Sequence, residues 1–83
     1  MTNSKLIHMI KALELSLREE IAKAERGESN KPIQQLNTIA NELEVMKAES
    51  GFVPSFPRMI IDSWDYDDPV GKQLMTVFSL YKR

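Results

Sequence analysis

The sequence predicts an all-α fold, in which an N-terminal antiparallel helical hairpin packs against one or two shorter C-terminal helices. Two long segments repeat apolar residues at the three- and four-residue spacing of a single helix face. A short polar turn around Gly27 separates these segments, and a stretch rich in Pro and Phe follows them. Because 83 residues are enough for one domain, we expect a single helical domain over residues 1–83.

The first helix is predicted over residues 4–26. Asn3 or Ser4 suits the N-cap position, because a short polar side chain can accept a hydrogen bond from the first turn. Gly27 suits the left-handed position that commonly follows a helix. The apolar stripe of this helix comprises Leu6, Ile10, Leu13, Leu17, Ile21 and Ala24.

The second helix is predicted over residues 31–49. Ser29 or Asn30 is a candidate cap, Pro32 is tolerated in the first turn, and Ser50-Gly51 ends the helix. Its apolar face spans roughly 140°, which is wide enough to contact two neighbours. That face comprises Ile33, Leu36, Ile39, Ala40, Leu43 and Met46.

Leu15 and Val45 lie off the two apolar faces, on helices predicted to be neighbours. Single exposed apolar residues are ordinary in soluble proteins. Two of them on adjacent antiparallel helices could also mark a second contact surface.

Residues 51–58 are predicted to be irregular but packed, because two prolines and a glycine interrupt a helix while two Phe and a Val are atypical of a loose linker. Residues 57–64 form a candidate short helix, with Ser55 as its cap and Pro57 near its start. A short strand is the alternative, since Ile60 and Ile61 are β-branched.

The last helix is predicted over residues 68–82. Asp67 or Asp68 is the expected N-cap, with Pro69 at the first helical position, and the terminal Lys82 and Arg83 suit the negative end of the helix dipole. Glycine in the first turn would allow another part of the backbone to come close there. The apolar stripe comprises Val70, Leu74, Val77 and Tyr81, and the glycine is Gly71.

Composition argues against several classes of function. The balance of 11 Lys and Arg against 12 Asp and Glu lacks the basic excess typical of nucleic-acid binding. The chain has no Cys, and its one histidine, His8, has no evident partner for catalysis or zinc binding, so we expect neither an enzyme nor a cofactor. No apolar run approaches the ~20 residues of a membrane span, and charges interrupt the start. We expect a cytosolic protein.

The most distinctive stretch is residues 62–69, which holds the only Trp, one of the two Tyr and four Asp. Aromatic rings beside carboxylates are typical of protein-binding surfaces. The spacing does not fit a calcium-binding EF-hand loop. Part of the stretch has structural explanations: the Trp as a core anchor, Asp68 as a cap, and an ion pair of Asp62 with Arg58. The predicted protein-binding residues are Asp62, Trp64, Asp65, Tyr66 and Asp67.

The sequence therefore predicts a small protein-binding module, an adaptor or inhibitor whose partner is another protein. One alternative is a structural protein whose hairpins self-associate as a four-helix bundle, and a homodimer is compatible with either hypothesis because a chain of this length builds a thin core. A second alternative is an acidic decoy that occupies the nucleic-acid site of a partner protein. None of the three requires direct contact with nucleic acid or a membrane.

Overall fold

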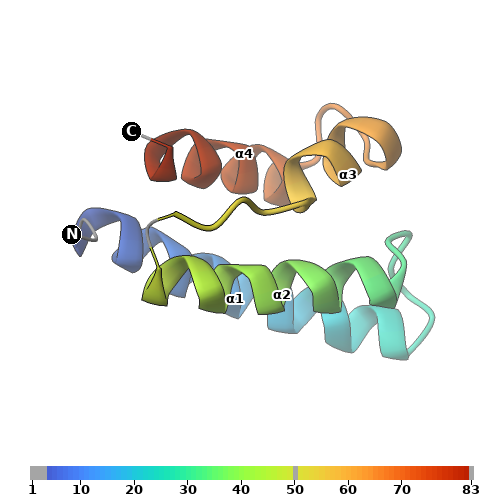
Figure 1. Ribbon diagram of the computed structural model, residues 1–83. Helices are drawn as coiled ribbons and strands as arrows, with labels where there is room; N and C mark the ends of the chain where they lie inside the picture. Colours follow the sequence, from blue (N-terminus) through green and yellow to red (C-terminus); the bar gives the residue numbers. More distant parts are fainter. Residues whose placement is uncertain (1–3, 50, 83) are drawn as a thin grey trace.

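A computed structural model describes residues 4–49 and 51–82 (Figure 1). These residues form four helices and no strand: α1 (Ser4–Glu25), α2 (Ile33–Ala48), α3 (Phe56–Ser63) and α4 (Pro69–Tyr81). The predicted all-α class is confirmed, as is the arrangement of a hairpin with two shorter helices packed on it. Three residues that the sequence analysis assigned to helix ends lie outside the described residues: Asn3, Ser50 and Arg83.

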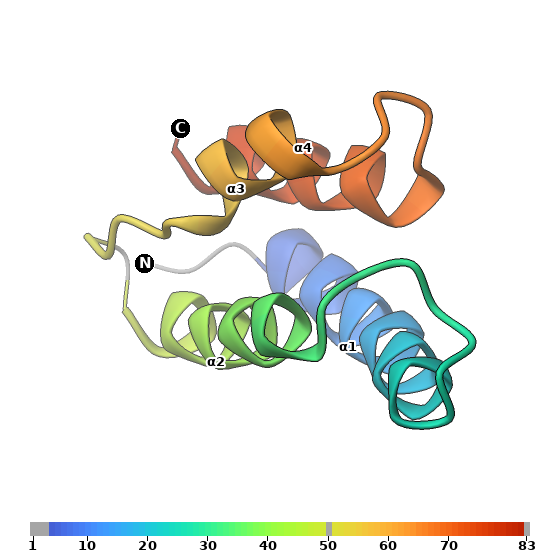
Figure 2. The same ribbon diagram turned by 90° about the vertical axis from the view of Figure 1, so that its right-hand side faces the viewer.

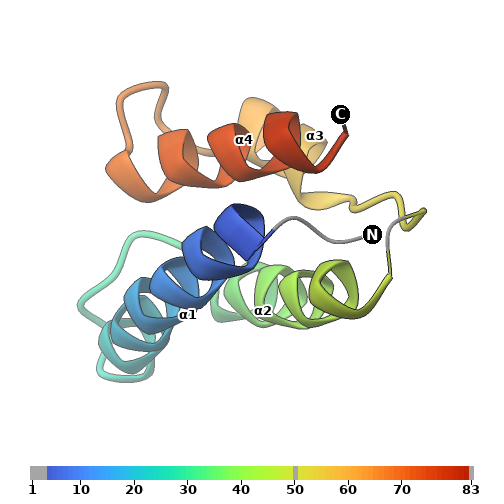
Figure 3. The ribbon, with the colours of Figure 1, turned by 90° about the vertical axis from the view of Figure 1, so that its left-hand side faces the viewer.

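The helices form two layers. Helices α1 and α2 run antiparallel in one layer, and α3 and α4 lie together in the other (Figures 2 and 3). Between the layers, α4 packs on α1 and α3 packs on α2. Within the layers, α1 contacts α2 and α3 contacts α4. The wide apolar face of α2 is thus covered within the chain, by α1 on one side and α3 on the other.

The hydrophobic core lies between the two layers. The expected stripes face it. The buried residues of α1 lie along its stripe between Leu6 and Leu17, and those of α2 lie along its stripe between Leu36 and Met46. Ile33, which the sequence placed on the apolar face of α2, is 36% exposed because it begins the first turn. The buried apolar side chains are Leu6, Ile10, Leu13, Leu17, Leu36, Ile39, Leu43, Met46, Phe56, Ile60, Leu74 and Val77.

Helix α1 ends as its glycine predicts. Gly27 has a φ angle of 74°, the left-handed conformation that favours glycine. The N–H of Glu28 donates to the carbonyl of Lys23 at 2.7 Å and that of Gly27 to Ala24 at 3.1 Å, the hydrogen-bond pattern of a Schellman motif. At the other end, Ser4 is already helical, so it does not precede α1 as a cap.

The predicted cap of α2 is wrong. The N-cap position is occupied by Pro32, which makes no capping hydrogen bond through its side chain, and the helix begins at Ile33. The hydroxyl of Ser29 instead donates to Glu20 at 3.0 Å and accepts from the N–H of Lys31 at 3.1 Å. Ser29 therefore orders the loop and joins it to α1, and it does not cap α2.

Helix α3 begins at Phe56, so residues 56–58 are helical and the predicted irregular segment ends at Ser55. Ser55 occupies the N-cap position but makes no capping bond. Glu42 of α2 caps the helix from outside: its carboxylate accepts from the N–H groups of Ser55 and Phe56 at 2.8 and 2.9 Å, and from the Ser55 hydroxyl at 2.6 Å. The segment before α3 is packed only in part, because Val53 is 82% exposed.

Tyr81 connects the end of α4 to the chain that leaves α2. Its hydroxyl accepts from the N–H of Phe52 at 2.9 Å and donates to the carbonyl of Glu49 at 2.7 Å. The hydroxyl thereby provides hydrogen-bond partners for two backbone groups of the chain that leaves α2. Together, Glu42 and Tyr81 fix the position of α3 and α4 on the hairpin, and with it the position of the site described next.

Candidate functional site

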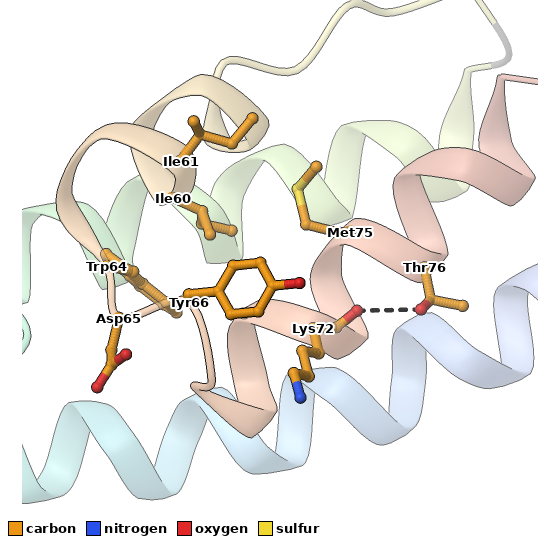
Figure 4. Close-up of a pocket in the computed structure, with 9 residues that line it drawn as sticks. Ile60, Ile61, Trp64, Asp65, Tyr66, Lys72, Met75 and Thr76 are labelled. Carbon is orange, nitrogen blue, oxygen red and sulfur yellow. Dashed lines mark hydrogen bonds between the residues drawn. The ribbon is translucent and has the colours of Figure 1, made fainter.

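An open pocket with a volume of about 650 Å³ lies between α3 and α4. We call it the α3–α4 pocket (Figure 4). Its volume is within the range of roughly 300–1,000 Å³ that is usual for ligand sites. It is lined by Ile60, Ile61, Trp64, Asp65, Tyr66, Gly71, Lys72, Met75 and Thr76.

The apolar lining follows from the way in which two short helices meet. Ile60 faces the core, and the next residue, Ile61, is turned by about 100° on an α-helix and is 71% exposed. In the same way Leu74 is buried in α4, whereas its neighbour Met75 lies at the pocket and is half-buried. Ile61 and Met75 therefore face the pocket from opposite helices (Figure 4).

Gly71 lets α4 approach the side chains of α3 and the loop that follows. A Cβ atom at this position would lie 3.3 Å from a Trp64 ring carbon and 3.4 Å from a methyl carbon of Ile60. The prediction that another backbone approaches Gly71 is therefore wrong, since side chains fill this space. The absence of a side chain at Gly71 allows the indole ring to pack directly on α4.

Trp64 is both a structural anchor and a wall of the pocket. It is half-buried against the core, and its indole N–H donates to the side-chain oxygen of Gln35 on α2 at 2.9 Å. The ammonium of Lys31 lies 5.2 Å from the ring centroid, within the range of a cation–π interaction. The anchor role predicted for Trp64 thus has two contacts to the hairpin that the sequence did not indicate.

A mostly buried ion-pair group holds the start of α4. Asp68 is the N-cap, as predicted: its carboxylate accepts from the N–H of Gly71 at 3.0 Å. The same carboxylate lies 2.7 Å from the ammonium of Lys31, which is also 3.9 Å from Glu20. The loop between α1 and α2 is therefore joined to the loop between α3 and α4 at one point.

This environment changes the acidity of Asp68. Burial raises the pKa of a carboxyl group, but the hydrogen bond from Lys31, the backbone hydrogen bonds and the charge of Lys31 outweigh that effect. The pKa of Asp68 consequently lies below its ordinary value. The carboxylate is charged in the folded protein at neutral pH, as both of its roles require.

Tyr66 projects from the loop and is 90% exposed. Its ring lines the pocket together with Ile60, Met75 and Lys72 (Figure 4). Two hydrogen bonds order the loop beside it: the Asp65 carboxylate accepts from the N–H of Asp67 at 3.3 Å, and the Asp65 carbonyl accepts from that of Asp68 at 3.1 Å. A large aromatic side chain is thus presented to solvent on an ordered turn.

Two of the carboxylates around the pocket have cationic neighbours. Asp62 lies 3.8 Å from Arg58, the pair that the sequence predicted, and Asp67 lies 3.8 Å from Lys72. Among the described residues, Asp65 makes no ion pair. After this pairing, the pocket is left with one uncompensated negative charge.

The structure brings together three of the five predicted site residues. Trp64, Asp65 and Tyr66 line the α3–α4 pocket, whereas Asp62 and Asp67 lie outside its lining. Sequence reasoning missed Ile61 and Met75 as site residues. The sequence does contain a signal for these two residues. Each immediately follows a core residue on a short helix, so its side chain must point away from the direction of that core residue.

Other residues singled out in the sequence lie outside the lining of the α3–α4 pocket. His8 is exposed on α1, and Leu15 is 63% exposed on the side of α1 opposite its buried stripe. Within residues 4–49 and 51–82, no group of three or more His, Cys, Asp or Glu is placed to hold a metal ion. None of the described helices combines the length and apolar character that crossing a membrane requires.

No protein-family model matches this chain, and no curated protein or solved structure matches it either. The proposals that follow therefore depend on the geometry and chemistry of the α3–α4 pocket. The pocket offers an apolar surface, an exposed tyrosine and one unpaired carboxylate. That combination suits contact with an apolar side chain flanked by a positive charge.

Proposed function

We propose that the protein is a small non-enzymatic protein-binding module, an adaptor or inhibitor, whose contact surface is the α3–α4 pocket together with Asp65 and Tyr66. The observation that carries this proposal is that two of the five large hydrophobic residues exposed in the described part of the chain lie side by side in one pocket. Ile61 and Tyr66 are 71% and 90% exposed, and both line the same pocket as Met75. Clustered exposed apolar and aromatic side chains mark interaction surfaces, whereas scattered ones do not.

The order of the surrounding structure supports this role. Trp64 is fixed by Gln35 and Lys31, and the start of α4 is fixed by Asp68, so the pocket walls are held before any partner arrives. A preformed surface loses less conformational entropy on binding than a surface that must first become ordered. The polar contacts at this site thus serve to position an apolar surface.

Capture from a cell lysate with three matched baits tests the proposal. The baits are the wild type, Ile61→Glu in the pocket, and Leu15→Glu on α1. Both substitutions place one carboxylate at an exposed apolar position, so circular dichroism should show that both variants fold. We expect a bound protein that is retained by Leu15→Glu and lost by Ile61→Glu. Equal capture by all three baits would exclude the pocket as the contact surface.

Self-association remains the alternative proposal, now through a different surface. Since α3 and α4 cover the apolar faces of the hairpin, pairing of hairpins is not needed to bury them. The α3–α4 pocket carries both Asp65 and Lys72, and opposite charges can complement each other across a twofold axis. Analytical ultracentrifugation at tens of micromolar protein distinguishes the two proposals. A wild-type dimer that Ile61→Glu dissociates would favour self-association.

A further inference from the structure

We infer that the α3–α4 pocket binds an amphipathic helix that presents two apolar side chains about one turn apart and a Lys or Arg beside them. This inference rests on the proposed function, because it names the partner chemistry of the same site. Three features of the pocket define that chemistry: the length of its apolar floor, the position of its aromatic residues, and its residual charge.

The length of the pocket fits two anchor side chains. On α4 the lining runs from Gly71 to Thr76, which corresponds to about 7.5 Å along a helix axis at 1.5 Å per residue. Side chains four residues apart on a partner helix are separated by about 6 Å along its axis. One anchor would pack between Ile61 and Met75, and the next would pack beside Tyr66.

A helix also suits the kind of surface that is available. An extended peptide that pairs with a sheet edge needs unpaired backbone groups, and the described part of the chain has no strand to offer them. A partner helix satisfies its own backbone hydrogen bonds and contributes only side chains. The pocket walls are likewise side chains of two helices and an ordered turn.

The sign of the partner charge follows from the ion pairs around the pocket. Lys72 is close to Asp67 and Arg58 is close to Asp62, each at 3.8 Å, whereas Asp65 makes no ion pair with any described residue. A guanidinium or ammonium group on the partner would therefore gain an unpaired carboxylate at the pocket rim.

The test is a selection of displayed helical peptides on the intact 83-residue protein. Each peptide carries two randomised apolar positions four residues apart and four randomised flanking positions, on an Ala-rich helix. Counter-selection on Ile61→Glu removes peptides that bind elsewhere, and Met75→Glu, on the opposite wall, provides a second blocked protein. Both blocked variants are first checked by circular dichroism and thermal unfolding.

We expect the selected peptides to be enriched in Lys or Arg at a flanking position next to the second anchor. Their affinity should fall by about tenfold or more on Asp65→Lys and by a smaller factor on Asp65→Asn, and the difference should shrink with added salt. Glu19→Lys, on an exposed face of α1, should leave the affinity unchanged. Selection on the Asp65→Lys protein should enrich Asp or Glu instead.

Each other outcome has a distinct meaning. Pocket-dependent peptides without an excess of basic residues, or with affinities insensitive to Asp65→Lys, would overturn the inferred partner chemistry and leave the proposed function intact. If no peptide distinguishes the wild type from both blocked variants, the proposed function itself fails. A wild-type dimer that Ile61→Glu dissociates would show that a second copy occupies the pocket, and this too would overturn the inference.

Discussion

The α1–α2 hairpin and the α3–α4 pair differ in how completely they bury their apolar residues. The hairpin supplies most of the buried side chains, and its two exposed large apolar residues, Leu15 and Ile33, lie on different helices. The α3–α4 pair contributes fewer buried residues and leaves Ile61 and Tyr66 exposed in one pocket. The comparison indicates a division of labour, in which the first half stabilises the fold and the second half presents a surface.

The two halves also differ in how their helix ends are stabilised. The end of α1 is stabilised locally, by the glycine and backbone hydrogen bonds of its own turn. The second half depends on side chains from the hairpin: Glu42 caps α3, Gln35 fixes Trp64, and Lys31 pairs with Asp68. The pocket is therefore built on the hairpin, so loss of the hairpin should abolish the pocket as well.

The largest expected effect is that of truncating the hairpin core. Leu36→Ala removes a side chain that is fully buried between α1 and the second layer. A cavity of this kind should reduce the free energy of unfolding by about 2–5 kcal/mol, a large part of the total for a small domain. Urea unfolding measured by circular dichroism provides the test.

Leu15→Ala is the matched control for that prediction, because it makes the same change at a position that is 63% exposed. We expect a change within about 0.5 kcal/mol. Similar losses for the two variants would mean that the inner and outer faces of the hairpin are wrongly assigned.

Trp64→Ala tests whether the second half is anchored to the first. The ring packs on Gly71 and donates a hydrogen bond to Gln35, but it is only half-buried, so we expect a loss of about 2–3 kcal/mol, below the value for a fully buried Trp. Native fluorescence should be blue-shifted relative to tryptophan in water. Water-like emission together with unchanged stability would refute the anchor role.

Sequence periodicity predicted the helices well because each apolar stripe is a local property of its own segment. The stripes of α1, α2 and α4 required only the spacing of apolar residues. Local sequence also indicated the Asp68 cap and the Arg58–Asp62 pair, since their partners lie within four residues.

The contacts that attach the second half to the hairpin were missed by sequence analysis because they join residues far apart in the chain. Glu42 replaces Ser55 as the cap of α3, Gln35 meets Trp64, and Lys31 meets Asp68. The pocket likewise exists only because Ile61 and Met75 come from two helices whose packing angle no local pattern specifies. The acidic-aromatic stretch was identified as a contact region, but the apolar floor beneath it was not.

Asp68→Asn removes the ion pair with Lys31 but keeps the helix cap, because Asn also caps helices well. The variant therefore measures the contribution of the ion pair alone. We expect a loss of about 1–2 kcal/mol at neutral pH, since the mostly buried ammonium of Lys31 loses its nearest carboxylate. In the wild type, the pKa of Asp68 is lower when folded than when unfolded. Its stabilising contribution is therefore present above the unfolded pKa and is lost as pH falls through the folded pKa.

Urea unfolding between pH 2 and 6 measures this dependence. The stability difference between the wild type and Asp68→Asn should be constant above about pH 5 and should shrink below about pH 4. A difference that does not change across this range would show that the Lys31–Asp68 pair does not contribute through its charge.

The smallest expected effect on stability is that of Tyr66, and Tyr81 at the end of α4 provides a matched control within the same half of the molecule. Tyr66 is 90% exposed at the pocket, whereas the hydroxyl of Tyr81 bonds to the backbone at Phe52 and Glu49. Tyr66→Ala should change the free energy of unfolding by less than about 0.5 kcal/mol and weaken binding of a pocket-selected peptide about tenfold or more.

Tyr81→Phe should do the reverse. It should reduce the free energy of unfolding by about 1 kcal/mol, because two backbone groups lose their partner, and leave peptide affinity unchanged. Unfolding and binding titrations on both variants decide the matter. If Tyr66→Ala destabilises the fold, or Tyr81→Phe weakens binding as strongly as Tyr66→Ala does, stability and recognition do not depend on separate residues of the α3–α4 pair, and the pocket must be treated as part of the core.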